Sequence, residues 1–384
     1  MIIRTYQLIL SPILKTNCRY LPTCSEYSLE SLKKHGLKTG RLKTGTPPRL
    51  SKKSINWSLA EKALGDDIPS PFSLFTKRPF FKQQESCFVV RTNKDVHSVI
   101  HNNISLSAMF SGKIKAIGPR YCPSIEDKIV RFESRDSHQL FLEPEWNDAK
   151  QIYVNGFSTS MPEDVQLLAL QTMDALKNVE LIRPGYAIEY DYIPSSQLKS
   201  TLETKSIKNL YLAGQINGTS GYEEAAGQGI VAGINAGRSS MGEEPWIPRR
   251  DEAFLGVLID DLVTKGVDEP YRLFTSRAEF RLLLRQDNCL ERLGGRALEL
   301  GLLDEKQRHL LACSKKELER IRNWVEKSRV TPEEMASYLG SAGGAPLKET
   351  SPLARVLLRP EVRLADLVHP DGLFSEVDFE LLKI

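Results

Sequence analysis

One glycine-rich stretch, residues 207–238, constrains the fold more than any other part of the chain. Its short apolar run, Leu210–Ala213, predicts a buried strand. Three glycines that allow unusual backbone conformations then follow: Gly214, Gly218 and Gly221. The small residues from Ala225 to Gly237 predict a helix, although each interior glycine costs roughly 0.5–1 kcal/mol. A helix that keeps such glycines is expected to lie close to another part of the structure.

A helix that begins beside a glycine turn offers two interpretations. Its N-terminus is a ready site for a phosphate or another electron-rich group, because unpaired N–H groups and the helix dipole meet there. The alternative is a tightly packed turn without a ligand, since glycine turns are common. Spacing alone leaves both open.

The same stretch resembles the second signature of the GidA (MnmG) family, the flavin-dependent tRNA uridine 5-carboxymethylaminomethyl modification enzymes. The residues at that family's spacing are Ala213–Gly218, Gly221–Glu224, Gln228 and Gly229. The resemblance implies that the turn contacts the isoalloxazine end of FAD, with developing negative charge near the helix N-terminus. The cofactor-binding residues it implies here are Gly214, Gln215, Asn217, Gly218, Gly221 and Tyr222.

A second signature surrounds Cys122. Prolines on both sides place this cysteine in a loop, and Arg120 and Lys128 would favour its thiolate. Ser124 is predicted to cap a helix that begins at Ile125. From these residues alone, an inert structural cysteine remains an open alternative.

This segment resembles the first GidA signature, which is associated with nicotinamide-cofactor binding and with a cysteine that attacks the uridine ring. The resemblance implies a catalytic role for Cys122. It also implies that NAD(H) is bound by Gly118, Arg120, Tyr121, Ser124, Glu126 and Lys128.

An arginine-rich block, residues 271–285, resembles a further family segment. In a helix, Arg277, Arg281 and Arg285 would share one face, which could meet tRNA phosphates together with Arg272. The alternative is a solvated or internally paired helix face.

The charge of the chain is unevenly distributed. Residues 1–53 hold eleven Lys and Arg against two Asp and Glu, whereas the remainder holds 41 against 47. The basic segment predicts an anionic partner, either a nucleic acid or a membrane surface. Residues 1–38 resemble the YidD family of membrane protein insertion efficiency factors through Cys18–Tyr27, and Thr23 or Ser25 is predicted to cap a helix from Glu26 to His35.

The two resemblances meet where Leu-Lys-Thr-Gly occurs twice, at 37–40 and 42–45. We interpret this point as a junction, with the GidA resemblance beginning near Arg41 and ending near residue 376. No GxGxxG-type fingerprint stands before residue 200, so the N-terminal dinucleotide-binding part of the family is expected to be missing and FAD binding by this chain to be weak or absent.

These observations predict an α/β chain with a partial FAD-dependent, Rossmann-like two-domain fold, a helical C-terminal segment and a short helical N-terminal appendage. The expected domains are residues 1–38, residues 41–240 with an inserted nicotinamide-binding segment, and residues 241–384. None of the six cysteines forms a CxxC pair, so no zinc site or disulfide scaffold is expected, and a cytoplasmic location follows.

The family resemblance implies modification of the tRNA wobble uridine (U34), with FAD, NAD(H) and methylene-folate, a GTPase partner and a homodimer, although activity of this chain is expected to be impaired. Two alternatives stay open. One is a membrane-surface factor that binds anionic lipid on the inner face of the plasma membrane through residues 1–38. The other is a non-functional fusion product.

Overall fold

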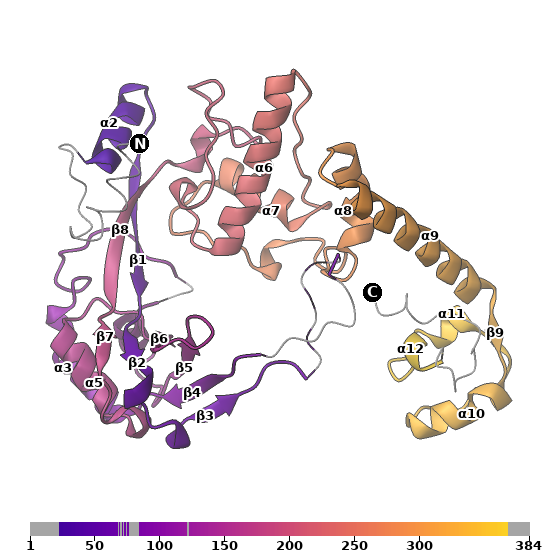
Figure 1. Ribbon diagram of the computed structural model, residues 1–384, viewed down its shortest axis with the longest axis horizontal. Helices are drawn as coiled ribbons and strands as arrows, with labels where there is room; N and C mark the ends of the chain where they lie inside the picture. Colours follow the sequence, from indigo (N-terminus) through magenta and orange to yellow (C-terminus); the bar gives the residue numbers. More distant parts are fainter. Residues whose placement is uncertain are drawn as a thin grey trace. The chain divides into compact units, whose positions relative to one another are not determined.

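The computed structural model describes residues 23–67, 69, 71, 73, 75–76, 84–120 and 123–367. It contains two compact units, shown with their elements in Figure 1. The first unit comprises Met1–Pro69 and Phe81–Arg281, and the second comprises Ser70–Phe80 and Leu282–Ile384. The second unit therefore begins later than the helical region that the sequence suggested from residue 241, because helix α7 (Phe254–Asp260) packs against α6 (Tyr222–Met241) in the first unit.

The described part of the first unit contains an antiparallel sheet of six strands in the order β3-β4-β5-β6-β2-β7. The strands are β2 (Arg49–Ser51), β3 (Glu61–Ala63), β4 (Cys87–Arg91), β5 (Gln139–Pro144), β6 (Gln151–Asn155) and β7 (Leu181–Arg183). Alternate residues of β5 and β6 are buried, which is the period-two pattern of a sheet with one covered face.

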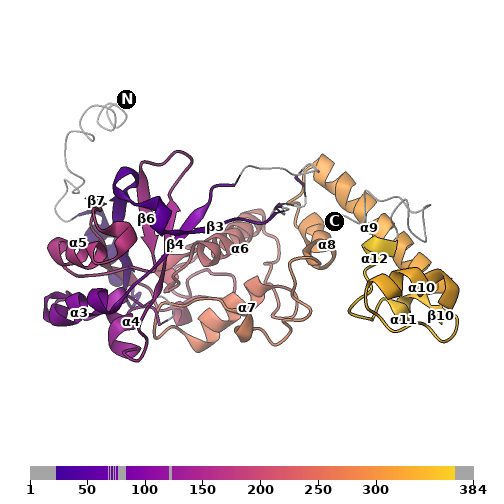
Figure 2. The same ribbon diagram turned by 90° about the horizontal axis from the view of Figure 1, so that it is seen from below.

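Three helices belong to this sheet: α3 (Lys94–Asn102), α4 (Ile125–Arg131) and α5 (Glu163–Gln171). Val96 and Ile100, four residues apart on α3, join Leu140 and Leu142 of β5 in one hydrophobic core. Figure 2 shows α3 and α5 beside the sheet. α5 ends at Gln171, and a separate 3-10 turn, Asp174–Leu176, follows it.

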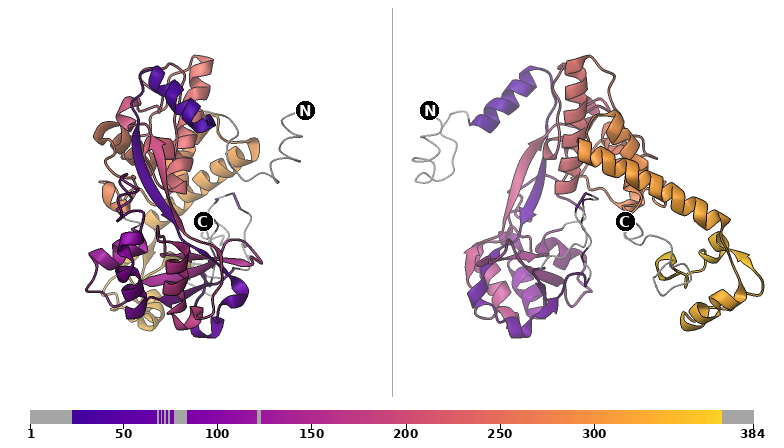
Figure 3. Two further views of the ribbon diagram at one scale, coloured as in Figure 1. Left: turned by 90° about the vertical axis from the view of Figure 1, so that its left-hand side faces the viewer. Right: turned by 45° about the vertical axis from the view of Figure 1, so that its right-hand side comes forward.

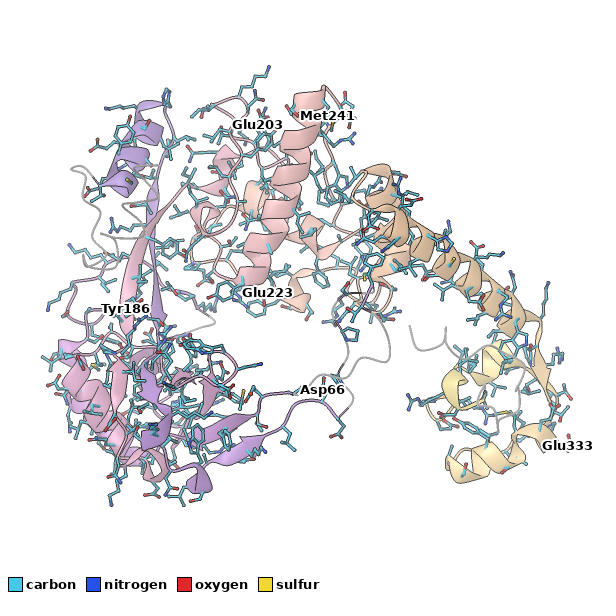
Figure 4. The ribbon with its side chains drawn as sticks, viewed as in Figure 1. Asp66, Tyr186, Glu203, Glu223, Met241 and Glu333 are labelled. Carbon is cyan, nitrogen blue, oxygen red and sulfur yellow. The ribbon has the colours of Figure 1, made fainter. Side chains whose placement is uncertain are left out.

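A two-stranded ribbon connects this sheet with the rest of the unit. Strands β1 (Gly40–Thr46) and β8 (Tyr186–Tyr192) are antiparallel and pair from Gly40↔Tyr192 to Thr46↔Tyr186. Tyr186, labelled in Figure 4, stands at the end of the ribbon nearer the sheet. Residues 47–185 thus lie between Thr46 and Tyr186, which are paired neighbours in the ribbon. They contain every residue of the sheet core. They form an inserted segment with a core of its own. That this segment binds a nicotinamide cofactor remains a prediction.

The glycine-rich stretch contributes to a second core. α6 extends from Tyr222 to Met241 and ends at Gly242, whose φ of 72° is left-handed; Glu223 and Met241 mark its two ends in Figure 4. Its Val231 and Ala232 pack with Ile193, Leu212 and other buried residues. The close approach expected at the helix glycines is found at Gly227, where a Cβ would lie 2.5 Å from Leu255 Cδ2. It is not found at Gly229 or Gly233, where nothing lies within 4 Å of a Cβ.

The strand predicted for Leu210–Ala213 does not form. Tyr211 makes an isolated bridge to Glu203, and the Leu212 N–H donates to the carbonyl of Leu202 at 3.0 Å. Asn209, directly before the run, and Leu202, on the segment that faces it, have positive φ angles of 63° and 66°. These angles interrupt the extended backbone that strand pairing needs.

The helix expected near residues 26–35 is confirmed as α2 (Cys24–Lys34), with Thr23 as its cap. The Thr23 and Glu26 side chains form a reciprocal capping box, and Gly36 follows the helix with a φ of 84°. Leu37 is 3% exposed and packs in the same core as Leu212 and Val231, with Leu32 beside it. α2 is therefore joined to the first unit through its core, which differs from the separate appendage predicted for residues 1–38.

The second unit is helical in its described part, where its elements are α8 (Cys289–Glu299), α9 (Glu305–Lys327), β9 (Arg329–Val330), α10 (Pro332–Ser341), β10 (Ser351–Pro352), α11 (Leu353–Val356) and α12 (Leu364–Leu367). Figure 3 shows α9 as its longest helix. Gly294 lets α8 approach α9, because a Cβ there would lie 2.5 Å from Leu311 Cδ1. A small core around Met335, Leu339 and Leu353 closes the unit. Among the residues that the structure describes, no helix is both long and apolar enough to span a bilayer.

Candidate cofactor and nucleic-acid site

The glycine turn places its predicted residues directly before α6. Gly214 has φ 88° and ψ −144°, and Gly218 has φ 82° in the left-handed region, with the 3-10 turn Gln215–Asn217 between them. Residues with a Cβ rarely adopt these angles, so both positions favour glycine. Gln215 is exposed, whereas Asn217 is fully buried.

Gln228, in the second turn of α6, holds the glycine turn together. Its Oε1 accepts hydrogen bonds from the Gly214 N–H at 3.1 Å and from Asn217 Nδ2 at 2.8 Å. Its Nε2 donates to Thr219 Oγ1 and to the Glu224 carbonyl, both at 3.0 Å. Gln228 is 0% exposed, so these bonds form away from water. Asn217, predicted to bind cofactor, is thus part of the internal scaffold of the turn.

The first turn of α6 has no side-chain cap. Gly221 precedes it, and Tyr222 is 93% exposed. A Cβ on Gly221 would lie 1.7 Å from Glu224 Oε2, so glycine leaves room for this buried carboxylate. Glu224 Oε1 accepts from the Leu273 N–H at 2.8 Å. The helix N-terminus therefore opens to solvent beside Tyr222, where it can face an electron-rich group.

The arginine block lies next to this turn, but it is not the predicted helix. Only Thr275–Arg277 forms a 3-10 turn, and Arg285 belongs to the second unit. Arg272 donates to the Ser220 carbonyl at 2.8 Å and pairs with Glu224 at 3.4 Å. Arg277 donates to the Arg272 carbonyl at 3.0 Å and stacks 4.5 Å from the Tyr271 ring centroid.

The expectation that Arg277, Arg281 and Arg285 share one helix face is therefore wrong, because the backbone from Ala278 to Asn288 is not helical and Arg277 packs on Tyr271. Arg281 is exposed, and Arg285 is paired with Asp287 at 2.9 Å. Contact of these arginines with tRNA remains a prediction.

The second predicted segment forms the N-terminal end of α4. Ser124 caps the helix as predicted, since its Oγ accepts from the Asp127 N–H at 3.2 Å. Tyr121 and Cys122 lie outside the described residues. Lys128 Nζ donates to the Gly156 carbonyl at 2.8 Å.

Glu126 is 0% exposed and accepts from the N–H and hydroxyl of Ser160 at 2.8 and 2.9 Å. Its Oε1 thus holds the loop at Ser160 in place, whereas its Oε2 is buried and forms no hydrogen bond among the described residues.

A cavity of 450 Å³ adjoins this segment. Of the predicted residues, Gly118, Arg120 and Ser124 line it, and none of the six from the glycine turn does. Lys43 of β1 also lines it, and a Cβ on Gly118 would lie 2.7 Å from Lys43 Cε. The lack of a side chain at Gly118 thus leaves room for the Lys43 side chain.

The cavity wall is hydrogen-bonded to the β1–β8 ribbon. The Lys43 N–H donates to the Ile117 carbonyl at 3.0 Å, and the Ala116 N–H donates to Glu189 Oε1 at 3.2 Å. Lys43 was not singled out from the sequence, where it stands in the second copy of the Leu-Lys-Thr-Gly repeat.

A second group missed by sequence reasoning centres on Asp261, which is 1% exposed at the start of the π-helical turn Asp261–Lys265. Its carboxylate accepts from Lys265 at 2.6 Å, from Arg250 at 2.9 Å and from the Tyr271 hydroxyl at 3.0 Å. Burial opposes ionisation, but these three hydrogen bonds hold the pKa of Asp261 below its usual value. A second hollow of 450 Å³, lined by Asp261, Lys265 and Arg277, shares Arg120 with the first cavity.

The fold and site define a mixed α/β protein with a glycine turn before a helix, an inserted sheet segment and a charged cavity. Comparison with known proteins names the family. A family model described as "Glucose inhibited division protein A" matches residues 15–244. The chain belongs to this GidA family, and the expected α/β fold with a partial cofactor-binding region is confirmed.

Curated relatives agree with this assignment. The "tRNA uridine 5-carboxymethylaminomethyl modification enzyme MnmG" of Thermodesulfovibrio yellowstonii is 52% identical over 334 residues, which cover 87% of this chain and 53% of the relative. The protein of the same name from Christiangramia forsetii is 48% identical over 337 residues, covering 88% and 54%. The chain spans about half the length of the curated relatives it matches.

Solved structures of Aquifex aeolicus GidA also match. The form I crystal structure aligns with a TM-score of 0.74 at 51% identity over 79% of this chain and 51% of that chain. Form II aligns with a TM-score of 0.76 at 45% identity, over 86% and 52%.

The family match also moves the junction inferred from the sequence. It begins at residue 15, well before Arg41, so it includes α2 and overlaps the segment that resembles YidD. Because Leu37 is buried in the core of the first unit, residues 24–37 belong structurally to the GidA part. Neither the membrane-factor nor the fusion interpretation gains support from these comparisons. Residues 1–22 lie outside the described part of the chain.

Proposed function

We propose that this chain takes part in the 5-carboxymethylaminomethyl modification of the tRNA wobble uridine (U34), in a reaction that depends on FAD and NADH. The observation that carries the proposal is the match to enzymes of that name at 48–52% identity across nearly nine-tenths of the chain. Methylene-folate, a GTPase partner and a homodimer belong to the same proposal through the family resemblance.

The residues present fit one end of a flavin. The turn from Gly214 to Gly221 leaves the uncapped N-terminus of α6 open beside the exposed Tyr222. Unpaired helix N–H groups favour the electron-rich edge of an aromatic ring system. A bound flavin supplies hydride transfer.

In this proposal Gln228 keeps the turn in the shape that exposes the helix N-terminus, and Gln215 and Tyr222 lie beside the ring. Gly118, Arg120 and Ser124 form the wall of the cavity for the nicotinamide cofactor. Cys122, two residues from both Arg120 and Ser124 in sequence, adds to the uridine ring and activates the neighbouring carbon. Arg272, Arg277, Arg281 and Arg285 contribute positive charge for tRNA.

The test uses the full chain in cells that lack the endogenous modification enzyme, with the tRNA nucleosides measured by mass spectrometry. Because activity of this chain is expected to be impaired, we expect less 5-carboxymethylaminomethyluridine with the wild-type chain than with a relative of full length, and none with Cys122→Ser. Cys87→Ser is the matched control, because burial raises the pKa of the Cys87 thiol on β4 and leaves it a poor nucleophile.

A parallel titration of FAD with the purified chain measures flavin binding directly by fluorescence quenching. A folded chain that neither quenches flavin fluorescence nor yields the modified nucleoside would refute the proposal.

A further inference from the structure

Asp261 is a buried carboxylate that has no part in the proposed reaction. It accepts hydrogen bonds from Lys265 at 2.6 Å, from Arg250 at 2.9 Å and from the Tyr271 hydroxyl at 3.0 Å. Burial raises the pKa of Tyr271, so the phenol keeps the proton that it donates. These partners are fixed in place, because breaking any of the bonds would leave a buried polar group unsatisfied.

Arg250 is neutralised inside this cluster. Besides Asp261, its guanidinium pairs with Asp260 at 2.9 Å and with Glu279 at 2.7 Å. It also donates to the backbone carbonyls of Val257 and Arg277. Arg250 is therefore saturated by acceptors of the protein and is not available to a further anion.

Arg277 differs, because the cluster orients its guanidinium and still leaves N–H donors unused. Its Nε donates to the Arg272 carbonyl at 3.0 Å, and its guanidinium carbon lies 4.5 Å from the Tyr271 ring centroid. Its Nη1 lies 3.9 Å from Asp261 Oδ2. Among the described residues only the Nε–H of Arg277 makes a hydrogen bond, so the N–H groups on both Nη atoms remain available at the second hollow.

The other arginines of the block in the first unit lack this combination. Arg272 is held by the Ser220 carbonyl and by the buried Glu224. Arg281 is exposed and forms no hydrogen bond or ion pair with a described residue. A guanidinium that is already oriented loses less side-chain entropy on binding than a free one, so Arg277 is the best prepared to bind an anion.

We propose that Asp261, through Tyr271, is a positioning residue that orients Arg277 toward a phosphate group of the RNA substrate. This inference rests on the proposed function, which supplies RNA as the anion. It gives Asp261 two opposite effects: its charge repels a phosphate, whereas its hydrogen bonds hold the cation that attracts one.

Asp268 offers a matched comparison, because it lines the same hollow and is exposed. Its carboxylate forms no hydrogen bond or ion pair with a described residue. Asp268 therefore acts on a bound phosphate by repulsion alone.

The test measures binding of an unmodified tRNA transcript with U34 to the full chain, by filter binding over a range of salt concentrations. Asp261→Asn removes one negative charge, so Coulomb attraction alone predicts tighter binding. We expect weaker binding instead, by about fivefold to tenfold, with a smaller dependence on salt because a phosphate contact is lost. Asp268→Asn makes the same change of charge and should tighten binding by less than about threefold.

A double variant shows whether Asp261 acts through Arg277. Arg277→Met should weaken RNA binding to a similar degree, and adding Asp261→Asn should weaken it no further. If circular dichroism shows that Asp261→Asn does not fold, Tyr271→Phe is the second variant. It keeps the net charge, loses the hydroxyl that Asp261 holds, and should weaken RNA binding at least about twofold.

Tighter RNA binding in Asp261→Asn, as in Asp268→Asn, would overturn the inference. Additive losses in the double variant would overturn it too, as would unchanged binding in Tyr271→Phe or a wild-type chain that binds no tRNA. If the variants rank as expected but cells yield no modified nucleoside, the inference stands and the proposed function fails.

Discussion

Removal of the Gln228 side chain should destabilise the first unit strongly. In Gln228→Ala the Gly214 N–H loses its 3.1 Å acceptor, and Asn217 and Thr219 each lose one partner inside the protein. A buried donor left without a partner costs about 1–3 kcal/mol. Asn217 retains its bond to the Leu212 carbonyl at 2.8 Å, so its loss is partial. We expect the free energy of unfolding to fall by about 3 kcal/mol, once the cavity left by the side chain is included.

The assay is urea denaturation combined with hydrogen exchange and mass spectrometry. Peptides from residues 210–235 report on the first unit, and peptides from 305–340 report on the second. Gln139→Ala is the control, because Gln139 is exposed at the start of β5 and should change stability by less than about 0.5 kcal/mol. A loss below about 1 kcal/mol in Gln228→Ala, with protection of residues 210–235 unchanged, would refute the reasoning.

Two further predictions use other features of the same unit. Gly221→Ala should destabilise the unit by about 1–3 kcal/mol, because the new Cβ would displace the Glu224 carboxylate. Gly229→Ala should stabilise the unit by about 0.5–1 kcal/mol, because nothing lies within 4 Å of the new Cβ. Thermal melts measure both variants, and equal shifts of the melting temperature would contradict the packing argument. The lowered pKa of Asp261 means that its ion pairs stabilise the fold above its unfolded pKa of about 3.9 and that this stabilisation is lost as the pH falls through the lower folded value. The melting temperature should therefore fall more steeply below about pH 4 in the wild type than in Asp261→Asn, which should already be less stable at pH 7; parallel pH profiles would contradict this role.

Local signals in the sequence predicted several elements well. Capping residues located the starts of α2 and α4, because the Thr23 and Ser124 side chains accept hydrogen bonds from backbone N–H groups three residues further on. Small residues predicted α6, and positive φ angles at Gly214 and Gly218 agree with the glycine turn. These features depend on residues that are neighbours in the sequence, so they can be predicted from the sequence alone.

Other features depend on contacts between distant segments. The arginines after Tyr271 have helical spacing, but Arg272 is held by Ser220, 52 residues away. Lys43 faces a cavity because Gly118, far along the chain, leaves room for it. The α2 helix resembled part of another family, yet Leu37 is buried against residues beyond 190. Only the folded chain shows which of these local patterns prevail.

The paired ends of residues 47–185 make this segment removable in principle. Thr46 and Tyr186 are already cross-strand partners, so a two-residue turn such as Asn-Gly could join β1 directly to β8 as a hairpin. Neither core would lose a residue to the other, since all members of the sheet core lie inside the excised segment. During the evolution of such a fold, the whole sheet segment could have been inserted at the tip of a single hairpin without altering the pairing register of β1 and β8.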